Sequence, residues 1–215
     1  MRLWVWNALE RQANSCLMAK LGFAMKRLRI TGGTMRGSLI KVEDDIMARH
    51  TASKVRESVF NMLGDIKGKK IIDFFSGSGI LAFEAISRGV VHATFVDIDK
   101  KATKNIEGNI EGLHLKDMCR VLNMDVFEAI SFLHKTNEVY DIFFMDPPYE
   151  KGYIEKTLKA LENGIIYNMD SIFVVECSKR EAWKSNLSKG WEIIKEKRYG
   201  DTVVAMINKS QSIKE

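Results

Sequence analysis

The sequence has few of the residues that build disulfide frameworks or metal sites. It contains three cysteines and four histidines in 215 residues. The cysteines, Cys16, Cys119 and Cys177, form no C-x-x-C pair, and the histidines show no metal-ligand spacing. A small, odd and scattered set of cysteines is typical of a reducing compartment. We therefore expect a cytoplasmic protein that holds no metal.

Long apolar runs are also absent. No stretch approaches the roughly 18 apolar residues that identify a membrane-spanning helix, and residues 1–24 lack the clean apolar core and cleavage site of a signal peptide. Met25 opens the basic segment MKRLRITGG. We expect the functional protein to start at Met25; alternatively, residues 1–24 form an amphipathic helix with Trp4, Leu9 and Ala13 on one face.

Positive charge is concentrated in the first third of the chain. Residues 1–70 carry 14 Lys and Arg against 6 Asp and Glu, a balance of +8, whereas residues 71–215 carry 19 against 22, a balance of −3. Such a division predicts a basic arm for a polyanion, attached to a nearly neutral body. The alternative is a solvated lysine-rich surface without a partner.

The residues that follow Met25 predict a small β unit and then a helix. The segment RLRITGGTMRGSLIKV places extended-type residues around glycine turns, which favours a β-hairpin within residues 25–50. The segment TASKVRESVFNML has apolar residues at helical spacing, with Thr51 or Ser53 available as the N-cap.

From Lys69 onward, strand patterns alternate with helix patterns. The expected strands are KKIIDFF, HATFVDI, CRVLNM, VYDIFFM and SIFVVECS, followed by two more strands around Tyr199-Gly200-Asp201. Repeated β-α units with one terminal hairpin predict an α/β domain over residues 51–209, with a seven-stranded, mostly parallel sheet and helices on both faces. Residues 210–215 are expected to be a tail.

A glycine turn directly after the first of these strands is the first candidate site. Ligands of open α/β sheets bind beyond the carboxyl ends of the strands, and glycines there allow close approach to the backbone. Gly77-x-Gly79-x-x-Ala82 also fits the loose dinucleotide fingerprint, so a nicotinamide enzyme is an alternative. The predicted cofactor contacts in this turn are Asp73, Phe75, Ser76, Gly77, Ser78 and Gly79.

Two acidic residues at later strand ends indicate an adenosine. Asp97, at the end of the second strand, can accept hydrogen bonds from both ribose hydroxyls, with Ile98 beside it. Asp125, after the third strand, is a candidate acceptor for the adenine amino group, with Val126 beside it. Asp125 could instead cap the next helix, and one residue could do both.

The two prolines of the protein are adjacent and follow the fourth strand. Pro147 and Pro148 lie between Asp146 and Tyr149. Each proline lacks an N–H and biases its predecessor to extended geometry, which makes a stiff loop with outward carbonyls. This set suits a planar base with an exocyclic NH2, which would stack on Tyr149 and donate to Asp146 and to the Pro147 carbonyl. A rigid turn without chemistry is the alternative.

Asp146-Pro147-Pro148-Tyr149 resembles the (D/N)-P-P-(Y/F) motif of amino-methyltransferases. Together with RITGGTMRGSLIKV, RHTASKVRESVFNML and DFFSGSG, it resembles the bacterial 16S ribosomal RNA guanine-N2 methyltransferase family over about residues 25–209. The resemblance implies a Rossmann-like class I methyltransferase fold, S-adenosylmethionine as cofactor, and a guanine N2 in 16S rRNA as target. It also implies a monomer that acts on an assembling or assembled small ribosomal subunit.

The resemblance also implies roles for residues outside the main motifs. Thr51 and Arg56 would help close over the cofactor; otherwise they are ordinary cap and surface residues. The family usually has proline at His50 and frequently Phe at Tyr149. The basic arm would bind phosphates through Lys26, Arg27, Arg29, Arg36 and Lys41.

Four other functions remain alternatives. A DNA adenine-N6 or cytosine-N4 methyltransferase uses the same loop, but no target-recognition domain is evident here. A protein glutamine methyltransferase usually has Asn at the position of Asp146. A nicotinamide oxidoreductase and a non-catalytic RNA-binding module on the same sheet are the alternatives from other classes.

Overall fold

The computed structural model describes residues 25–43, 52–162, 166–187 and 190–210. The predictions that concern residues 1–24, His50, Thr51 and most of the expected tail lie outside these ranges. None of the helices in the described ranges has the length and apolar character needed to cross a membrane.

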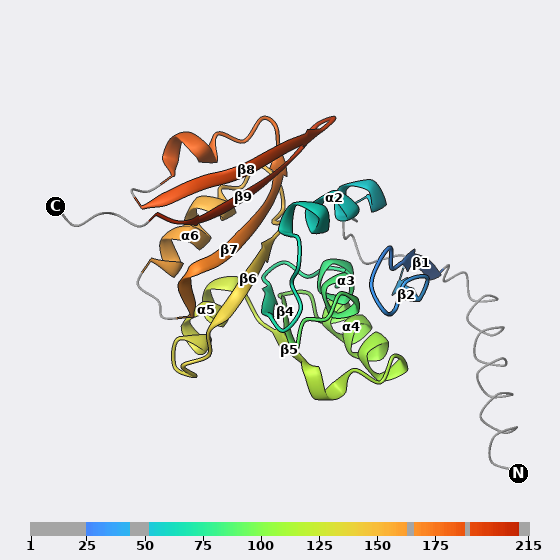
Figure 1. Ribbon diagram of the computed structural model, residues 1–215. Helices are drawn as coiled ribbons and strands as arrows, with labels where there is room; N and C mark the ends of the chain where they lie inside the picture. Colours follow the sequence, from blue (N-terminus) through green and yellow to red (C-terminus); the bar gives the residue numbers. More distant parts are fainter. Residues whose placement is uncertain (1–24, 44–51, 163–165, 188–189, 211–215) are drawn as a thin grey trace, which may run out of the picture.

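The centre of the molecule is a seven-stranded sheet, as expected (Figure 1). Its strands lie in the order β5-β4-β3-β6-β7-β9-β8. The first five are mutually parallel, and β9 runs antiparallel to both β7 and β8. The bounds are β3 (Lys70–Asp73), β4 (His92–Asp97), β5 (Cys119–Asn123), β6 (Tyr140–Met145), β7 (Tyr167–Ser178), β8 (Trp191–Tyr199) and β9 (Thr202–Lys209).

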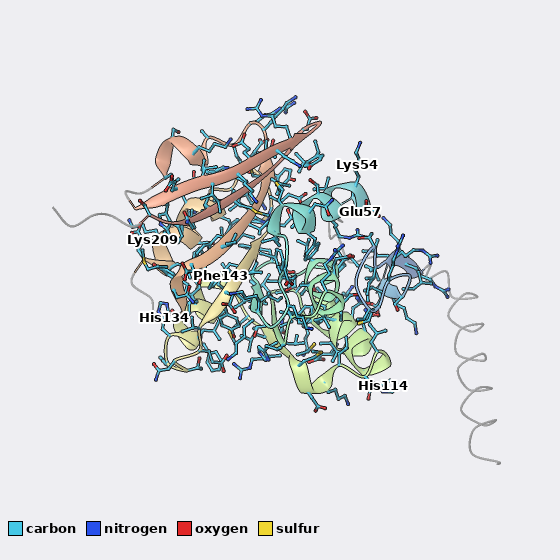
Figure 2. All side chains as sticks on the ribbon, viewed as in Figure 1. Lys54, Glu57, His114, His134, Phe143 and Lys209 are labelled. Atoms are coloured by element: carbon cyan, nitrogen blue, oxygen red, sulfur yellow. The ribbon has the colours of Figure 1, made fainter. Side chains whose placement is uncertain are left out.

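Helices cover both faces of the sheet. One face packs against α2 (Ser53–Leu63), α3 (Ile80–Ser87) and α4 (Lys100–Gly112), and the other against α5 (Val126–Leu133) and α6 (Tyr153–Leu161). Two short 3-10 turns, Lys116–Met118 and Trp183–Asn186, were not predicted. The exposed side of α2 carries Lys54, which projects away from the body of the molecule (Figure 2).

Strand β6 shows why the central strands read as continuous apolar runs. All of its residues except Asp141 are buried. Successive side chains of a strand point to opposite faces. Phe143 therefore stacks on Phe173 at 4.3 Å between ring centroids, whereas Phe144 packs against Phe60 of α2 on the other face. A strand covered by helices on both faces needs apolar residues at every position.

The predicted N-terminal hairpin is confirmed as a separate two-stranded sheet. Strand β1 (Met25–Arg29) pairs antiparallel with β2 (Leu39–Glu43). The hairpin lies against α3 and α4, outside the main sheet (Figure 1). Ile30, Ile40 and Val42 are fully buried or nearly so, and belong to the same apolar cluster as α3 and α4.

The start of α2 corrects one expectation. Ala52 occupies the N-cap position and no side-chain capping hydrogen bond is present, so the prediction that Ser53 caps the helix is wrong. Ser53 is the first helical residue, and its hydroxyl accepts from the guanidinium of Arg56 at 3.4 Å.

Candidate active site

A cavity of about 390 Å³ opens at the carboxyl ends of the parallel strands. It lies where the strand order reverses between β3 and β6, the position at which open α/β sheets bind ligands. Four strand ends contribute most of its walls. The lining consists of residues 73–78, 80 and 81 after β3, 97–99 after β4, 124–126 after β5 and 146–149 after β6, together with Ala102 and Tyr153.

The turn after β3 is held against β4 by a serine. The Ser76 hydroxyl donates to the Asp73 carbonyl at 2.9 Å and accepts from the Val96 N–H at 3.0 Å. Gly79 has φ 74°, and a Cβ on it would lie 3.0–3.1 Å from three side chains beneath the turn. Gly79 therefore shapes the turn from below and does not line the cavity, unlike the other five residues that we predicted here.

Asp73 supplies a buried acceptor at the base of the cavity. Its side chain is 2% exposed, and its Oδ1 has no hydrogen-bond partner among the described residues. Burial raises the pKa of Asp73 to about 7, the nearby charge of Asp97 adds to the rise, and the Phe75 backbone N–H opposes it. A buried acceptor without a donor is costly unless a ligand supplies one. The amino group of an amino-acid-like ligand would do so.

Asp97 lies at the end of β4 and faces the cavity. Its two carboxylate oxygens accept from the Gly77 N–H at 2.7 Å and from the Asp99 N–H at 2.8 Å. Burial raises its pKa, and these two backbone hydrogen bonds lower it. Each carboxylate oxygen can accept a second hydrogen bond, so both can still bind a vicinal diol. Ile98, which is 71% exposed at the cavity edge, offers an apolar surface to a planar ring.

The helices that follow β4 and β5 are both capped by aspartates in the lining. Asp99 accepts from the Lys101 N–H at 2.8 Å and so caps α4. Asp125 accepts from the Phe127 N–H at 2.8 Å and caps α5. Asp125 also lines the cavity beside Val126. The capping role that we considered for Asp125 is therefore confirmed. Because Asp125 also lines the cavity, a ligand could still reach its carboxylate.

The D-P-P-Y loop forms a further wall of the cavity, after the strand that neighbours β3. Asp146 and Tyr149 are half-buried, Pro147 is buried and Pro148 is exposed. All four line the same cavity as residues 73–78. The Tyr149 hydroxyl donates to Oε1 of Glu176 on β7 at 3.4 Å, so the far end of the ring is tethered to the sheet. The two halves of the predicted site thus meet in one cavity.

The sequence patterns did not identify an aromatic corner of this cavity. The ring of Tyr153, the first residue of α6, lies 5.7 Å from Phe75 and 6.4 Å from Phe127, almost parallel to the latter. Its position four residues after Tyr149 was the available signal, but only the apolar face of α6 was considered. The other lining residues missed are Phe74, Ile80, Leu81, Asp99, Ala102 and Met124.

Arg56 does not lie where we expected it. It is 1% exposed, does not line the cavity, and donates to the Arg29 carbonyl at 2.8 Å. Burial lowers its pKa, and Glu84 opposes the shift. Arg56 therefore lies between α2 and the hairpin, and not over the cavity as the resemblance implied. The five basic residues predicted to bind phosphate all lie on the hairpin, outside the cavity lining.

Histidine and cysteine do not gather anywhere in the described ranges. No group of three or more His, Cys, Asp or Glu side chains there could hold a metal ion. His114 and His134 lie at separate edges of the molecule (Figure 2).

A mostly parallel sheet that ends in an antiparallel hairpin, with a glycine turn and a D-P-P-Y loop lining one cavity at the switch point, defines a Rossmann-like methyltransferase that uses S-adenosylmethionine. The Asp73 oxygen that has no partner among the described residues and the Asp97 carboxylate in the lining would fit the ammonium and the ribose of that cofactor. Residues 28–208 match the model of the family described as Conserved hypothetical protein 95, and the chain belongs to that family.

Named relatives agree with this assignment. The chain is 33% identical over 175 residues to Ribosomal RNA small subunit methyltransferase D of Escherichia coli (strain K12), covering 81% of this chain and 86% of that protein. The solved yhhF structure from Escherichia coli matches with a TM-score of 0.74 and 28% identity, covering 86% and 99% of the two chains. SMU.776, solved in complex with SAH, matches with a TM-score of 0.65 and 17% identity, covering 86% and 56%. This last likeness is one of fold.

Proposed function

We propose that this chain transfers the methyl group of S-adenosylmethionine to the exocyclic N2 of a guanine in 16S rRNA, at guanine position 966. The observation that carries the proposal is the single cavity that joins the turn after β3 to the D-P-P-Y loop after β6. The relatives named ribosomal RNA small subunit methyltransferase D support RNA of the small subunit as the substrate class.

Four residues would hold the cofactor. Asp97 would accept both ribose hydroxyls, Ile98 would cover the adenine ring, and Asp125 would accept from the adenine amino group. Asp73 would accept from the ammonium of the methionine part through its Oδ1, which has no partner among the described residues. Held by these residues, S-adenosylmethionine would supply an electrophilic methyl group for the transfer.

The D-P-P-Y loop would hold the target amine. The nitrogen lone pair of guanine N2 is delocalised into the ring, so the amine is a poor nucleophile. Asp146 and the Pro147 carbonyl would accept its two N–H bonds and so stabilise the increasingly positive nitrogen of the transition state. No strong base is needed, because the proton becomes acidic only after the methyl group has arrived.

Positioning would supply the larger part of the rate. Aligned intramolecular reactions gain up to ~7–11 kcal/mol over the bimolecular reaction in ideal cases. Tyr149, tethered through its hydroxyl to Glu176, would present a fixed ring for the base to stack on. A base within structured RNA must be unpaired or extruded to reach this ring.

The hairpin would bind the RNA backbone. Lys26, Arg27 and Arg29 on β1 are exposed, as are Arg36 in the turn and Lys41 on β2. Contacts of this kind are salt-sensitive and carry no sequence information. Specificity would come from RNA shape and from the accessibility of the target base.

Methyl transfer from tritiated S-adenosylmethionine tests the substrate. The enzyme is offered small ribosomal subunits, naked 16S rRNA, duplex DNA and a release factor in parallel. We expect label in 16S rRNA, recovered as N2-methylguanosine after nuclease digestion, with the better of the two RNA substrates showing whether the enzyme prefers an assembled particle. Label in DNA or in protein alone would overturn the proposal.

A further inference from the structure

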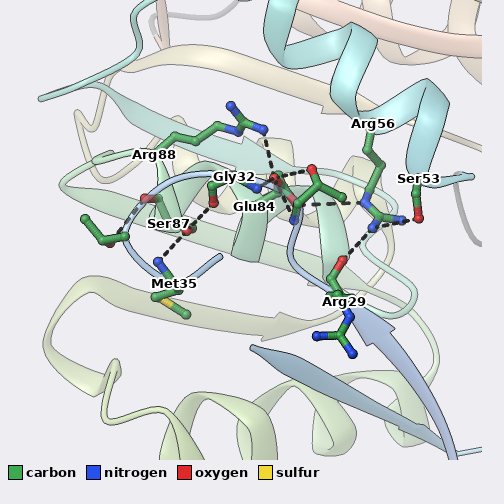
Figure 3. A network of polar contacts seen from close by, with 10 residues as sticks. Arg29, Gly32, Met35, Ser53, Arg56, Glu84, Ser87 and Arg88 are labelled. Carbon is green, nitrogen blue, oxygen red and sulfur yellow. Dashed lines mark hydrogen bonds and ion pairs between the residues drawn. The ribbon is translucent and has the colours of Figure 1, made fainter. Parts of the chain in front are cut away.

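A buried carboxylate on α3 holds the basic hairpin in place. Glu84 is 0% exposed and accepts hydrogen bonds from the Thr31 N–H at 2.9 Å, the Thr31 hydroxyl at 2.7 Å and the Gly32 N–H at 2.8 Å (Figure 3). Thr31 and Gly32 lie one residue beyond the end of β1, after Ile30. The charge of Glu84 is therefore satisfied in large part by hairpin backbone.

Two arginines complete this junction. Arg88 donates to Glu84 at 2.9 Å, and Arg56 of α2 lies 3.9 Å from it (Figure 3). Arg56 also donates to the carbonyl of Arg29 on β1. A buried charge that loses its partners is strongly destabilising. Undocking of the hairpin would cost Glu84 its backbone donors and Arg56 its carbonyl, so the docked arrangement is favoured.

The end of α3 makes a second attachment to the hairpin turn. The Ser87 hydroxyl donates to the Gly32 carbonyl at 2.6 Å and accepts from the Met35 N–H at 2.8 Å (Figure 3). The Ser87 carbonyl accepts from the Thr34 N–H at 2.7 Å. Gly33 has φ 77°, and a Cβ on it would lie 1.9 Å from that carbonyl oxygen. The turn therefore lies directly on the backbone of α3.

Helix α4 makes a third attachment, to the second strand of the hairpin. The Lys41 N–H donates to Asn109 Oδ1 at 2.9 Å, and the Lys41 carbonyl accepts from Asn109 at 2.8 Å and Asn105 at 3.0 Å. The two asparagines thus satisfy the edge of β2 as a neighbouring strand would. Only the backbone of Lys41 is used, and its side chain stays exposed.

The same helix α3 connects the hairpin to the cavity. It begins directly after the glycine turn and carries Glu84 and Ser87 along its length. The hairpin side chains buried against α3 and α4 are apolar, whereas its Lys26, Arg27 and Arg36 side chains are exposed. The hairpin is therefore built as a fixed platform at a set distance from the turn, and not as a loose arm.

We propose that Glu84 is a positioning residue for the RNA substrate. Through Thr31 and Gly32 it fixes the hairpin on α3, and so holds the exposed cations at a set place relative to the D-P-P-Y loop. The inference rests on the proposed function for the identity of the polyanion, but the docking that it describes does not. Loss of the Glu84 charge should free the hairpin and weaken RNA binding, while the cofactor site stays intact.

The variant Glu84→Gln tests this, with Glu107→Gln on the exposed side of α4 as the matched control. We expect faster hydrogen exchange at the amides of Thr31, Gly32 and Met35, and unchanged calorimetric affinity for S-adenosylmethionine. The KM for 16S rRNA should rise by about tenfold with kcat nearly constant, because several hairpin cations no longer meet their phosphates. The slope of log affinity against log salt should become shallower by about one for each phosphate that the hairpin no longer neutralises.

A second variant removes the docking without removing a charge. Gly33→Ala forces the turn away from Ser87, whereas Gly37→Ala places the same residue at φ 91° in the same turn with its nearest neighbouring atom at 3.9 Å. We expect Gly33→Ala to reproduce the exchange, KM and salt-slope changes of Glu84→Gln. Gly37→Ala carries a comparable backbone strain at positive φ but no clash with α3, so it should leave these three quantities much closer to wild type. If Glu84→Gln does not fold, the comparison of Gly33→Ala with Gly37→Ala still tests whether docking of the hairpin controls RNA binding.

The outcomes separate this inference from the proposed function. Unchanged exchange in folded Glu84→Gln or Gly33→Ala would overturn the docking itself, whatever the substrate. Faster exchange with an unchanged KM and salt slope would overturn the positioning role and leave the proposed function standing. A wild-type enzyme that methylates no RNA would count against the proposed function, and the exchange experiment would still decide whether Glu84 docks the hairpin.

Discussion

At the scale of single residues, the proposed function assigns cofactor binding and chemistry to different carboxylates. Asp73 and Asp97, proposed to hold the cofactor, lie at the ends of β3 and β4, whereas Asp146 lies in the loop after β6. All three carboxylates line the same cavity. Substitutions at these positions should therefore affect different measured quantities.

Replacement of Asp146 by Ala should retain cofactor binding and lose most turnover. A preorganised acceptor that acts on developing charge typically contributes about 10²–10³ in kcat. Calorimetry with S-adenosylmethionine and tritium transfer to 16S rRNA measure the two quantities. Asp170→Ala, at an exposed position of β7, is the control. Turnover close to that of the wild type would contradict the role of Asp146.

The raised pKa of Asp73 predicts that cofactor binding releases a proton. Burial raises its pKa to about 7, and a bound ammonium would favour the ionised form and lower that pKa. Near pH 6 the carboxyl is mostly protonated, so binding should release up to about one proton, and affinity should fall as the pH drops below about 7.

Calorimetry near pH 6 in two buffers of different ionisation enthalpy measures this release. Asp73→Asn cannot ionise and should bind the cofactor more weakly without releasing the proton. Equal binding enthalpies for the wild type in the two buffers would show that Asp73 does not face the ammonium.

At the scale of elements, two aspartates at the junction of β4 and α4 perform different tasks. Asp99 caps α4 through the Lys101 N–H, whereas Asp97 faces the cavity. Asp99→Ala should lower the free energy of unfolding by about 1 kcal/mol, the usual cost of a lost N-cap. Asp99→Asn should retain most of this free energy of unfolding, because Asn caps a helix about as well as Asp.

Urea denaturation measures the Asp99 effect, and calorimetry shows whether the cofactor site is affected. Asp97→Ala should instead weaken cofactor affinity, because it removes the proposed acceptor for the ribose hydroxyls. The assignment of tasks would be reversed if Asp99→Ala lost cofactor binding and Asp97→Ala did not.

The elements that could be predicted from sequence are those whose signal is local. The strand from Tyr140 to Met145 is buried on both faces and reads as one apolar run, and Asp99 and Asp125 precede helices in cap positions. The D-P-P-Y loop and the glycine turn could be placed together because parallel strands share a carboxyl edge.

The features that escaped prediction depend on tertiary packing. Helix α3 is buried on all sides, so its sequence has no polar face. Without that pattern, nothing indicated that Glu84 would be a buried hydrogen-bond acceptor. Arg56 lies on an otherwise amphipathic helix, and only the docked hairpin explains its burial. Each of these needs knowledge of which surfaces meet.

At the scale of the whole molecule, the excess positive charge and the cavity belong to different parts of the fold. The sheet and its helices provide the cavity, and the excess of positive charge lies in residues 1–70, which include the hairpin. The hairpin shares its apolar cluster with α3 and α4, and its five basic residues lie outside the cavity lining. The proposed attraction of RNA and the proposed methyl transfer can therefore be altered by different substitutions.

Neutralising the hairpin should therefore change RNA binding without changing the methyl-transfer site. A variant with Gln in place of Lys26, Arg27, Arg36 and Lys41 should show a salt slope for 16S rRNA binding that is smaller by up to about four, since each phosphate contact contributes about one. Cofactor affinity and kcat at saturating RNA should stay close to wild type. A matched variant with Gln in place of the exposed Lys104, Lys116, Lys156 and Lys159 removes the same net charge elsewhere. Equal slopes for the two variants would mean that overall charge, and not the hairpin, attracts the RNA.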